Sequence, residues 1–414
     1  LDWDEGPAAD NRGSIGPHGA YFQSQRLDIY ARYLDVLKAA GLAYPSFESK
    51  AEVEAEREAA LAEGRAPSGA FEKATDEEVQ AMLGKGLKPA WRFRVPENGV
   101  TEFQDLVHGP MRFENRLMAD FVIVRSDGMP TYNFAAVVDD ALMDITHVLR
   151  GDDHLSNTPR QVCLYRALGF KEPAFAHFPM ILGADKQRLS KRHGATAVGE
   201  YETLGFLPET LLNYLALLGW SLDDKTTLIS VSELVAAFSL ERVTKHAAVF
   251  DPVKLAWMNG HYVRQSDDGR LAPLIRAQFK RAGLERDDES WWPRLAHALK
   301  EKVRTLAELP AENAFFFRRD KPEPEAQKRF VDAGGPGLVP RLVSLLENAT
   351  FDVVALEGAL RSFCADGGPK FKDAVAVLRC AVSGRIVTPG LFETLALLGR
   401  EECAARVRAA GGWE

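Results

Sequence analysis

Residues 145–182, ITHVLRGDDHLSNTPRQVCLYRALGFKEPAFAHFPMIL, read as a strand, a polar loop, a helix and a second strand. The first strand covers residues 145–150, and Thr158 followed by Pro159 suits the start of the helix, as an N-cap and a first helical residue. The second strand, residues 175–182, runs into another polar loop. Alternation of this kind predicts an open, doubly wound α/β sheet whose ligands bind at the loops that follow the strands.

Upstream of this unit the pattern is first helical and then β. Apolar residues recur at helical spacing within residues 23–42: Leu27, Tyr30, Leu34 and Leu37. Residues 51–66 are rich in charge, which predicts an exposed helix or hairpin. Residues 89–149 contain short runs of strand composition, among them MPTYNF at 129–134, and Asp127-Gly128 predicts a hairpin turn.

Beyond Pro208 the chain is predicted to be helical. Apolar stripes at helical spacing occur in four early segments: residues 208–219, 232–238, 254–257 and 271–282. Residues 295–309, LAHALKEKVRTLAEL, are predicted as one helix that brings Lys300, Lys302 and Arg304 near one another. The alternative for each of these three cations is a solvated helix face without a ligand.

The composition argues against a protein coated uniformly for nucleic acid. The chain has 414 residues, 46% of them hydrophobic, and a net charge of −8, so a polyanion has to meet a local basic surface. The cysteines are dispersed without metal-ligand spacing, which favours a reducing cytoplasm: Cys163, Cys364, Cys380 and Cys403. No apolar run approaches the roughly 20 residues of a membrane span, so no membrane partner is expected.

The loop KQRLSKRHG, residues 186–194, concentrates four cations, a hydroxyl and a glycine after a predicted strand. Such a loop can wrap a triphosphate. The Lys191 ammonium would offset charge that develops on phosphate oxygens in a transfer transition state, while Arg188 and Arg192 could clamp those oxygens. The alternative is a solvated basic loop without a ligand, since short motifs give many false matches.

A second candidate group lies around Arg150 in the loop between the first strand and the helix. Arg150 could pair with a substrate carboxylate, and Tyr132, on the predicted strand MPTYNF, could offer its hydroxyl to the same small molecule. The alternatives are an ordinary surface salt bridge and a core tyrosine. Asp139 and Asp140 follow an apolar run and are assigned a structural role as loop caps.

The basic loop at 186–194 resembles the lysine-methionine-serine-lysine-serine loop of class I aminoacyl-tRNA synthetases, in the form used by glutamyl enzymes. Other segments resemble consecutive stretches of glutamyl-tRNA synthetases in the same order: DFVIVRSDGMPTYNFAAVVDD, ITHVLRGDDHLSNTPRQ, FLPETLLNYLALLGW, FDPVKLAWMNGHYVR and TPGLFETLALLG. The resemblance runs from LDWDEGP nearly to the last residue. It implies ATP-dependent ligation of L-glutamate to tRNA-Glu through glutamyl-adenylate by a monomer, with Mg²⁺ accompanying ATP.

The resemblance also implies roles for individual residues. ATP-binding roles fall on Ile181, Asp153, Arg188, Leu189, Ser190, Lys191 and Arg192. Lys191, together with Ser190, falls in the catalytic group, because in relatives the second lysine of this loop stabilises the activation transition state. Glutamate-binding roles fall on Tyr132, Ala136 and Arg150, and Lys302, near Lys300 and Arg304, falls where a basic residue reads the anticodon.

Several positions depart from the family pattern. Asp153 replaces the glutamate that relatives often carry. Ala136 replaces an asparagine found in some relatives, so a glutamate contact there is lost or replaced by one from the backbone. Ser46 and Glu48 stand where many bacterial relatives have a cysteine pair, so no zinc is expected. The chain opens on Leu1 without the histidine-isoleucine-glycine-histidine motif, so we expect a fragment that binds tRNA without forming glutamyl-adenylate.

The expected architecture is a Rossmann-type class I catalytic domain with an inserted α+β connective domain, followed by all-α stem-contact and anticodon-binding domains. The expected divisions are residues 1–28 and 131–200 for the two catalytic segments, 29–130 for the insertion, 201–265 for the stem-contact domain and 266–414 for the anticodon-binding domain.

Three alternatives remain. One is a non-catalytic tRNA-binding fragment or paralogue of a glutamyl or glutaminyl enzyme. Another is a small-molecule nucleotidyltransferase, which has no use for the long helical C-terminal region. A glutaminyl enzyme is a nearer neighbour, although the family's glutaminyl members carry β-barrels where this chain is predicted to be helical.

Replacing Lys191 with alanine in the complete gene product should slow amino-acid activation far more than it weakens amino-acid binding. The reason is that charge stabilisation concentrated in the transition state contributes about 3 to 4 kcal/mol for comparable donors. Pyrophosphate exchange measures activation, and an unchanged exchange rate would refute the role.

Overall fold

The computed structural model describes residues 3–8, 13–63, 74–190, 192, 194 and 197–413. The chain divides into two compact units, each described here by itself. The first comprises Leu1–Ile181, Gly219–Leu222 and Phe238–Ala248, and the second comprises Leu182–Leu218, Asp223–Ala237 and Val249–Glu414. Lys191 and His193 of the basic loop lie outside the described residues.

The first unit contains a helix and a small antiparallel sheet that share one core. Helix α1 spans Leu27–Ala39 and buries Tyr30, Leu34 and Leu37, which recur at helical spacing as predicted. Leu27 was predicted on the same face but is 40% exposed, because it lies in the first turn, where the helix has only begun. The helix ends at Ala39, and the predicted stop at Gly41 follows two residues later with a φ of 67°, which suits glycine.

Two sheets follow in the first unit. The order β3-β4-β7 gives a three-stranded antiparallel sheet, and the order β6-β5-β9-β8 gives a four-stranded sheet in which β5, β9 and β8 are parallel. The strands have these bounds: β3 Ala43–Ser46, β4 Ala90–Phe93, β5 Val100–Asp105, β6 Gly109–Glu114, β7 Phe121–Val124, β8 His147–Gly151 and β9 Ala174–Phe178.

The predicted strand, loop, helix and strand are confirmed by β8, the 3-10 turn Asp152–His154, helix α5 (Thr158–Ala167) and β9. Asn157, rather than Thr158, occupies the N-cap position of α5. Because β8 and β9 are parallel neighbours, their carboxyl ends lie at the same edge of the sheet, where Arg150 pairs in register with His177. This edge is where an open α/β sheet presents its ligand site.

Tyr132 does not lie on a strand, and that expectation was wrong. It is the first residue of helix α4 (Tyr132–Leu142), whose residues Phe134, Val137 and Val138 are buried at helical spacing. Asp139 and Asp140 therefore lie inside a helix and are not loop caps. Asp139 nevertheless has a structural role, since it accepts hydrogen bonds from Arg26 Nε at 2.8 Å and from the Tyr30 hydroxyl at 2.7 Å.

The helices and strands that flank the two sheets are short or exposed. Residues 51–66 were predicted as a helix or a hairpin, and α2 (Lys50–Glu63) is a helix. The predicted turn at Asp127-Gly128 is confirmed by a hydrogen bond from Arg125 N to Met129 O of 2.9 Å. The other elements are β1 Gly6–Pro7, β2 Ser14–Ile15, α3 Asp76–Gly84, β10 Ile181–Leu182 and β11 Ala248–Val249.

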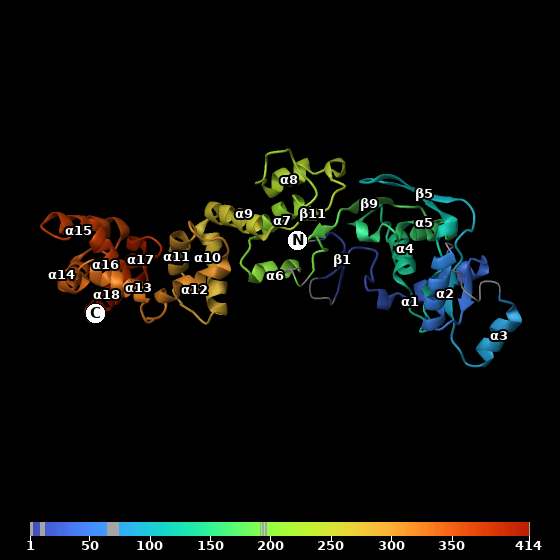
Figure 1. Ribbon diagram of the computed structural model, residues 1–414, viewed down its shortest axis with the longest axis horizontal. Coiled ribbons are helices and arrows are strands. Elements are labelled where there is room, and N and C mark those ends of the chain that lie inside the picture. The colour runs from blue at the N-terminus through green and yellow to red at the C-terminus, as the bar shows by residue number, and fades with distance from the viewer. Residues whose placement is uncertain are drawn as a thin grey trace. The chain divides into compact units, whose positions relative to one another are not determined.

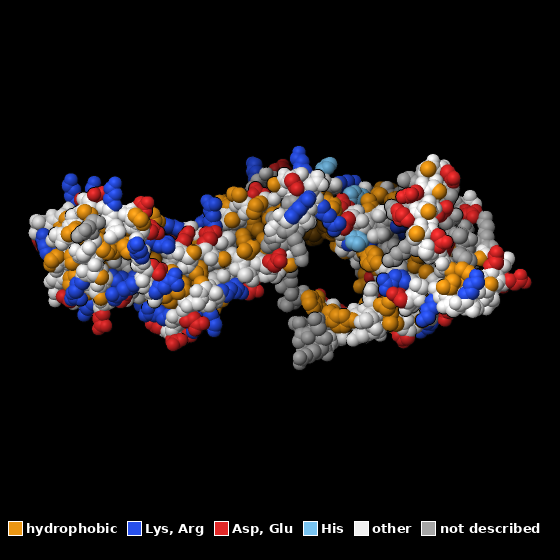
Figure 2. Space-filling model, turned by 60° about the horizontal axis from the view of Figure 1, so that its bottom comes forward, with side chains coloured by type: hydrophobic (Ala, Val, Ile, Leu, Met, Phe, Trp, Pro, Cys, Tyr) orange, Lys and Arg blue, Asp and Glu red, His pale blue; other side chains and the backbone are white. Residues whose placement is uncertain are grey.

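The second unit is helical, as the sequence predicts. Its helices are α6 Val198–Thr203, α7 Pro208–Ala216, α8 Val231–Ala237, α9 Pro252–Gln265, α10 Asp268–Arg281, α11 Trp291–Leu299, α12 Leu309–Asn313, α13 Pro324–Asp332, α14 Gly335–Asn348, α15 Val353–Ala365, α16 Phe371–Ser383, α17 Leu391–Leu398 and α18 Arg400–Ala410. Figure 1 shows α10 to α12 gathered in one group and α13 to α18 in another. In the view of Figure 2, Lys and Arg side chains on these helices are interspersed with Asp and Glu.

Each group of helices has its own apolar core. Trp291 and Trp292 are both 1% exposed and anchor the first core, and their indole N–H groups bond to carbonyls of Leu397 and Arg286. The second core surrounds Phe330. Indole rings bury a large apolar area while their N–H groups still need a partner, so these bonds fix the orientation of α11.

The expectation of one helix over residues 295–309 was wrong, because α11 ends at Leu299. After that point the backbone makes tertiary hydrogen bonds in place of helical ones. Asn259 Nδ2 donates to the carbonyl of Arg304 at 2.6 Å, and Leu306 N donates to the carbonyl of Gly205 at 3.0 Å. Within the described residues, no helix is long and apolar enough to cross a membrane.

The pKa of the partly buried Asp140 carboxyl makes the stability of the first unit depend on pH. Burial, with a smaller contribution from the neighbouring Asp139 carboxylate, raises its pKa from 3.8 to about 6. Because the folded pKa lies above the unfolded one, the stabilising contribution of the bound proton is full below pH 3.8 and is lost as the pH rises through about 6.

We therefore expect Asp140→Asn to become more stable relative to the wild type as the pH rises from about 5 to about 7.5, by about 1.4 kcal/mol. Urea denaturation of both proteins at the two pH values measures this difference, in which the titration of all other groups cancels. An unchanged difference in stability would contradict the raised pKa.

Candidate functional site

Arg150 lies near the end of β8, and its guanidinium is held by four side chains. Nη2 donates to Thr158 Oγ1 at 2.7 Å and to Gln161 Oε1 at 2.8 Å. Nε donates to His177 Nε2 at 3.2 Å, and Nη1 donates to the Tyr132 hydroxyl at 3.1 Å. The predicted pair of Arg150 and Tyr132 is thus brought together by the end of β8 and the start of α4.

Behind Arg150 lies a fully buried pair of titratable groups. His177 Nδ1 and Asp105 Oδ2 are 2.6 Å apart, and both side chains are 0% exposed. Burial alone would raise the pKa of Asp105. The hydrogen bonds from His177 and from the backbone N–H groups of His108 and Val107 outweigh that effect and lower the pKa of the Asp105 carboxyl below its ordinary value.

The hydrogen bonds of Arg150 leave one of its N–H groups available for a ligand. A guanidinium has five N–H groups, and the four bonds to Tyr132, Thr158, Gln161 and His177 use four of them. Among the described residues, the fifth, on Nη1, has no partner. Because the Tyr132 hydroxyl accepts from Nη1, its own hydrogen is also available. Two donors side by side can hold the two oxygens of one carboxylate.

The first turns of α4 complete this group. Tyr132 is 48% exposed, and its ring packs against His154 with centroids 5.3 Å apart. Ala136 lies one helical turn after Tyr132 and is half-buried, so it faces the same side of α4 without a polar contact. Gln161, which holds Arg150, also donates to Asn133 Oδ1 at 3.2 Å and so ties α5 to α4.

The predicted ATP-binding residues fall in two places. Asp153 is exposed in the 3-10 turn after β8. In the second unit, Leu182 forms a bridge with Arg188, and the turn between them is closed by Gly183 N bonding to Gln187 O at 2.8 Å. The loop is therefore a tight hairpin at its base. Arg192 Nη2 lies 3.5 Å from Asp185 Oδ2, and both side chains are largely exposed.

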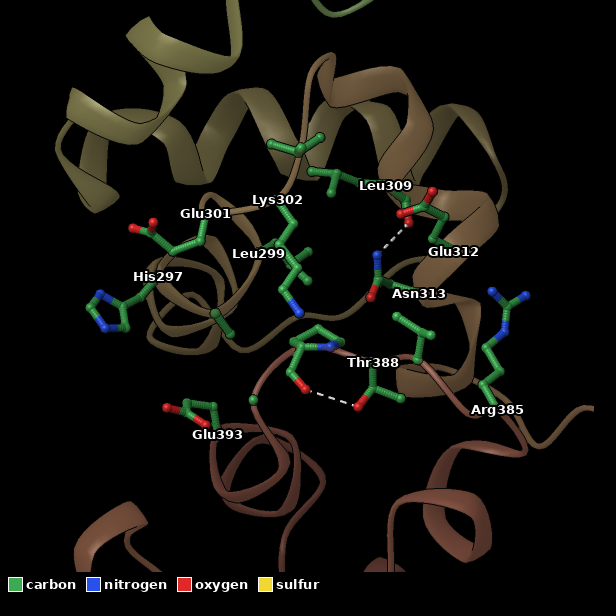
Figure 3. Close-up of a pocket in the computed structure, with 15 residues that line it drawn as sticks. His297, Leu299, Glu301, Lys302, Leu309, Glu312, Asn313, Arg385, Thr388 and Glu393 are labelled. Atoms are coloured by element: carbon green, nitrogen blue, oxygen red, sulfur yellow. Dashed lines mark hydrogen bonds between the residues drawn. The ribbon is translucent and has the colours of Figure 1, made fainter. Parts of the chain in front are cut away.

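The helical unit contains a pocket of about 500 Å³ around Lys302, shown in Figure 3. Its lining comes from the end of α11 and the turn after it, from α12, from the loop before α17 and from the first turn of α17: His297, Ala298, Leu299, Glu301, Lys302, Val303, Leu309, Glu312, Asn313, Arg385, Val387, Thr388, Pro389, Gly390 and Glu393. The Lys302 side chain points into the space between α12 and the loop that carries Thr388.

Of the three predicted anticodon residues, Lys302 is the one that lines this pocket. Lys300 is bound elsewhere, since its Nζ lies 2.7 Å from Asp268 Oδ1 and 3.2 Å from the carbonyl of Ser266. Arg304 is exposed and does not line the pocket. The end of α11 at Leu299 separates these cations, which a continuous helix would have kept together.

Sequence reasoning missed four residues of the Arg150 site. Thr158 was assigned as a helix cap, and Gln161, His177 and Asp105 were not singled out. A signal existed for the last two, because a His in the middle of the apolar run FAHFPM and an Asp ending the strand VTEFQD both fall where burial is expected. Buried polar side chains are nearly always hydrogen-bonded, so Asp105 and His177 could have been predicted as partners of one another.

A family model described as tRNA synthetases class I (E and Q), catalytic domain, matches residues 2–257. The chain belongs to this family. A second family model, described as an anticodon binding domain, matches residues 270–411. The α/β part is therefore a class I synthetase catalytic domain, and the helices that follow include an anticodon-binding domain with the Lys302 pocket inside the matched range.

Sequence similarity to relatives covers nearly the whole length of this synthetase. It is 43% identical to "Glutamate--tRNA ligase 1" of Syntrophomonas wolfei, over 99% of this chain and 83% of that protein. It is 42% identical to "Glutamate--tRNA ligase" of Moorella thermoacetica, over 100% of this chain and 85% of that protein. The solved structure of a glutamate tRNA ligase from Elizabethkingia meningosepticum, in complex with its amino acid, matches with a TM-score of 0.80 and 26% identity, over 97% of this chain and 85% of that one.

No cluster of three or more His, Cys, Asp or Glu side chains in the described part of the synthetase could hold a metal ion. Ser46 and Glu48, which stand at the expected cysteine positions, hydrogen-bond to each other through their side chains. The expectation that no zinc binds stays a prediction.

Proposed function

We propose that this protein ligates L-glutamate to tRNA-Glu in an ATP-dependent reaction that passes through glutamyl-adenylate. The observation that carries the proposal is the Arg150 group, in which a fixed guanidinium and the Tyr132 hydroxyl offer two adjacent donors at the carboxyl edge of a parallel sheet. Further support comes from relatives about 40% identical over nearly the whole chain that are named glutamate--tRNA ligases.

The donor pattern favours an acidic amino acid over its amide. Arg150 Nη1 and the Tyr132 hydroxyl both donate hydrogen bonds, and both oxygens of a carboxylate can accept them. A carboxamide would present its own NH₂ to one of these donors and leave a polar group unpaired, which is a strong basis for rejecting glutamine.

The carboxylate at Arg150 is the side-chain carboxylate of glutamate in this proposal, because the reacting carboxylate has to remain nucleophilic. The α-carboxylate attacks the α-phosphorus of ATP, a new O–P bond forms, the bond to the β-phosphate breaks and pyrophosphate leaves. The terminal ribose hydroxyl of tRNA then attacks the activated carbonyl, loses its proton and displaces AMP.

ATP handling is assigned to the loop that begins at Leu182. We propose that Arg188, Ser190 and Arg192 bind phosphate oxygens and that Lys191 stabilises the transition state, with Mg²⁺ bound by the nucleotide and water. The hairpin at the base of the loop supports this proposal, because it fixes the position of the backbone from which Arg188 and the following cations extend. Asp153, Ile181 and Leu189 are proposed to line the nucleotide site by resemblance alone.

The Lys302 pocket is proposed to receive an unstacked base of the tRNA anticodon. Its volume of about 500 Å³ is in the range of small-ligand pockets, and the part of the chain around it matches an anticodon-binding model. Sequence-specific RNA recognition usually targets unstacked bases, which present their pairing edges to side chains. Lys302 supplies a donor there, and Glu301, Glu312 and Glu393 supply acceptors.

The alternative, a tRNA-binding paralogue without activation chemistry, has no specific observation in its favour, because the Arg150 group would then hold a guanidinium in place without a use. A monomeric state, a cytoplasmic location and the five-part domain division given above remain predictions.

Replacing Arg150 with alanine should raise the glutamate KM by at least roughly tenfold, because a hydrogen bond to a charged group contributes about 1.5 to 3 kcal/mol. The ATP KM should stay nearly unchanged, since the lost contact involves one substrate. Pyrophosphate exchange at varied glutamate and varied ATP, with the complete gene product, measures both constants.

Arg125→Ala is the matched control, because Arg125 forms a largely exposed ion pair with Asp127 and lies outside the Arg150 group. It should leave both constants at the wild-type value. If Arg150→Ala raises the two KM values equally, the loop has misfolded, and Tyr132→Phe, which removes one hydroxyl, decides the question. An unchanged glutamate KM in both variants would overturn the proposed site.

Replacing Lys302 with alanine should reduce discrimination between wild-type tRNA-Glu and a tRNA-Glu with an altered anticodon. The expected loss is about tenfold in the ratio of the two charging efficiencies, as one base contact contributes about 1 to 3 kcal/mol. Lys280→Ala is the control, since Lys280 is an exposed lysine of α10 that does not line the pocket. An unaltered ratio for Lys302→Ala would remove Lys302 from anticodon reading.

A further inference from the structure

The buried pair of Asp105 and His177 contacts Arg150 through His177 Nε2, and neither side chain of the pair is exposed. Asp105 ends β5, His177 lies on β9 and Arg150 lies on β8. The three residues therefore come from three neighbouring parallel strands of one sheet. Both members of the pair are 0% exposed, and neither was assigned a role above.

The hydrogen bonds of Asp105 settle the tautomer of His177. One carboxylate oxygen, Oδ1, accepts from the backbone N–H groups of Val107 at 2.9 Å and His108 at 2.8 Å. The other, Oδ2, lies 2.6 Å from His177 Nδ1. A carboxylate only accepts, so Nδ1 carries the hydrogen, and a neutral imidazole then has its free lone pair on Nε2.

That lone pair faces two donors, Arg150 Nε–H at 3.2 Å and the Thr158 hydroxyl at 2.9 Å, and it can accept from both. In the other tautomer an N–H of His177 would face the N–H of Arg150, and the ring would bond only to Thr158 Oγ1, which lies 2.9 Å from Nε2. A doubly protonated ring would also place a cation beside the guanidinium. Only the tautomer selected by Asp105 therefore supplies the Nε bond of Arg150, while the bonds to Tyr132, Thr158 and Gln161 do not depend on it.

We propose that Asp105 and His177 are positioning residues for glutamate binding, in which Asp105 selects the His177 tautomer and His177 orients the Arg150 guanidinium toward the side chain of the bound amino acid. This inference rests on the proposed role of Arg150 as the carboxylate-binding residue. It predicts that a change at Asp105, which is fully buried and bonded to His177, alters the KM for glutamate and leaves the KM for ATP unchanged.

Asp105→Asn tests the tautomer directly. The two backbone N–H groups at Val107 and His108 require an oxygen at the Oδ1 position, so the asparagine NH₂ takes the place of Oδ2 and donates to His177 Nδ1. The hydrogen of His177 then moves to Nε2 and opposes Arg150 Nε–H. A serine protease triad responds to the same substitution with the wrong histidine tautomer.

The glutamate KM of Asp105→Asn, measured by pyrophosphate exchange with the complete gene product, should rise roughly 10- to 100-fold, the factor expected for a lost hydrogen bond to a charged group. The ATP KM should change by less than about twofold, because no ATP contact is lost. ¹⁵N NMR of the histidine-labelled protein should show the hydrogen on Nδ1 of His177 in the wild type and on Nε2 in Asp105→Asn. The chain has nine histidines, and the signals missing from His177→Gln assign those of His177.

His177→Gln is the conservative variant that keeps the proposal testable. A glutamine amide can donate to Asp105 through its NH₂ and accept from Arg150 through its oxygen, so this variant should keep the glutamate KM within a few fold of the wild type. In the double variant with Asp105→Asn the amide has to turn around, and the glutamate KM should rise as in Asp105→Asn alone.

Failure of this inference differs from failure of the proposed function. If Arg150→Ala raises the glutamate KM but Asp105→Asn changes it less than about threefold, positioning by the pair is refuted while the site stands. If Asp105→Asn raises the KM for glutamate and ATP equally, or leaves the His177 tautomer unchanged, the inference is also wrong. If Arg150→Ala itself has no effect on glutamate, the proposed function fails, and the NMR result still decides whether Asp105 sets the tautomer.

Discussion

A guanidinium that is partly removed from water has to be hydrogen-bonded on every side that water does not reach, because an unpaired buried donor costs about 1 to 3 kcal/mol and more when it is charged. The first unit meets this requirement for Arg150 by bringing together two strands and two helices. β8 supplies the arginine, β9 supplies His177, α4 supplies Tyr132, and α5 supplies Thr158 and Gln161. A shift of any one element would break a bond, so the arginine ties the packing of the sheet to that of its covering helices.

The backbone of the helical second unit is subject to the same requirement that buried polar groups be hydrogen-bonded. Where α11 ends, the carbonyl of Arg304 and the N–H of Leu306 are satisfied by Asn259 and Gly205. Asn259 is 0% exposed and also accepts from Leu207 N at 2.8 Å, so one amide joins α9, the start of α7 and the segment after α11. Because this segment leaves the helical path, Lys302 lines the pocket while Lys300 bonds to Asp268.

The sequence predicts elements well where periodicity is strong and poorly where tertiary bonds override it. The strand, loop and helix around Arg150 and the helices beyond Pro208 were predicted, and the family match agrees with the predicted fold. Tyr132 was misplaced because a short run with strand composition cannot be told from the first turn of a buried helix. The bend after Leu299 was missed because its cause, Asn259, lies 40 residues upstream of the α11 end, and propensity carries no information at that distance. The hydrogen bonds of Asp105 and His177 were missed for the same reason, since 72 residues separate them.

The interposed histidine also has an electrostatic consequence. A carboxylate bonded directly to Arg150 would satisfy the cation and compete with the side chain of the amino acid, since opposite charges in contact interact far more strongly than charges one ring apart. With His177 between them, the Asp105 charge compensates burial of the guanidinium at a distance, and among the described residues no carboxylate hydrogen-bonds to it. Asp140, a second acid near Arg150, has a pKa that burial raises to about 6, so its charge is largely present at neutral pH and is lost as the pH falls below about 6. The remaining Nη1 N–H of Arg150 and the Tyr132 hydroxyl therefore stay available as donors, and an anionic side chain is the ligand that completes the group.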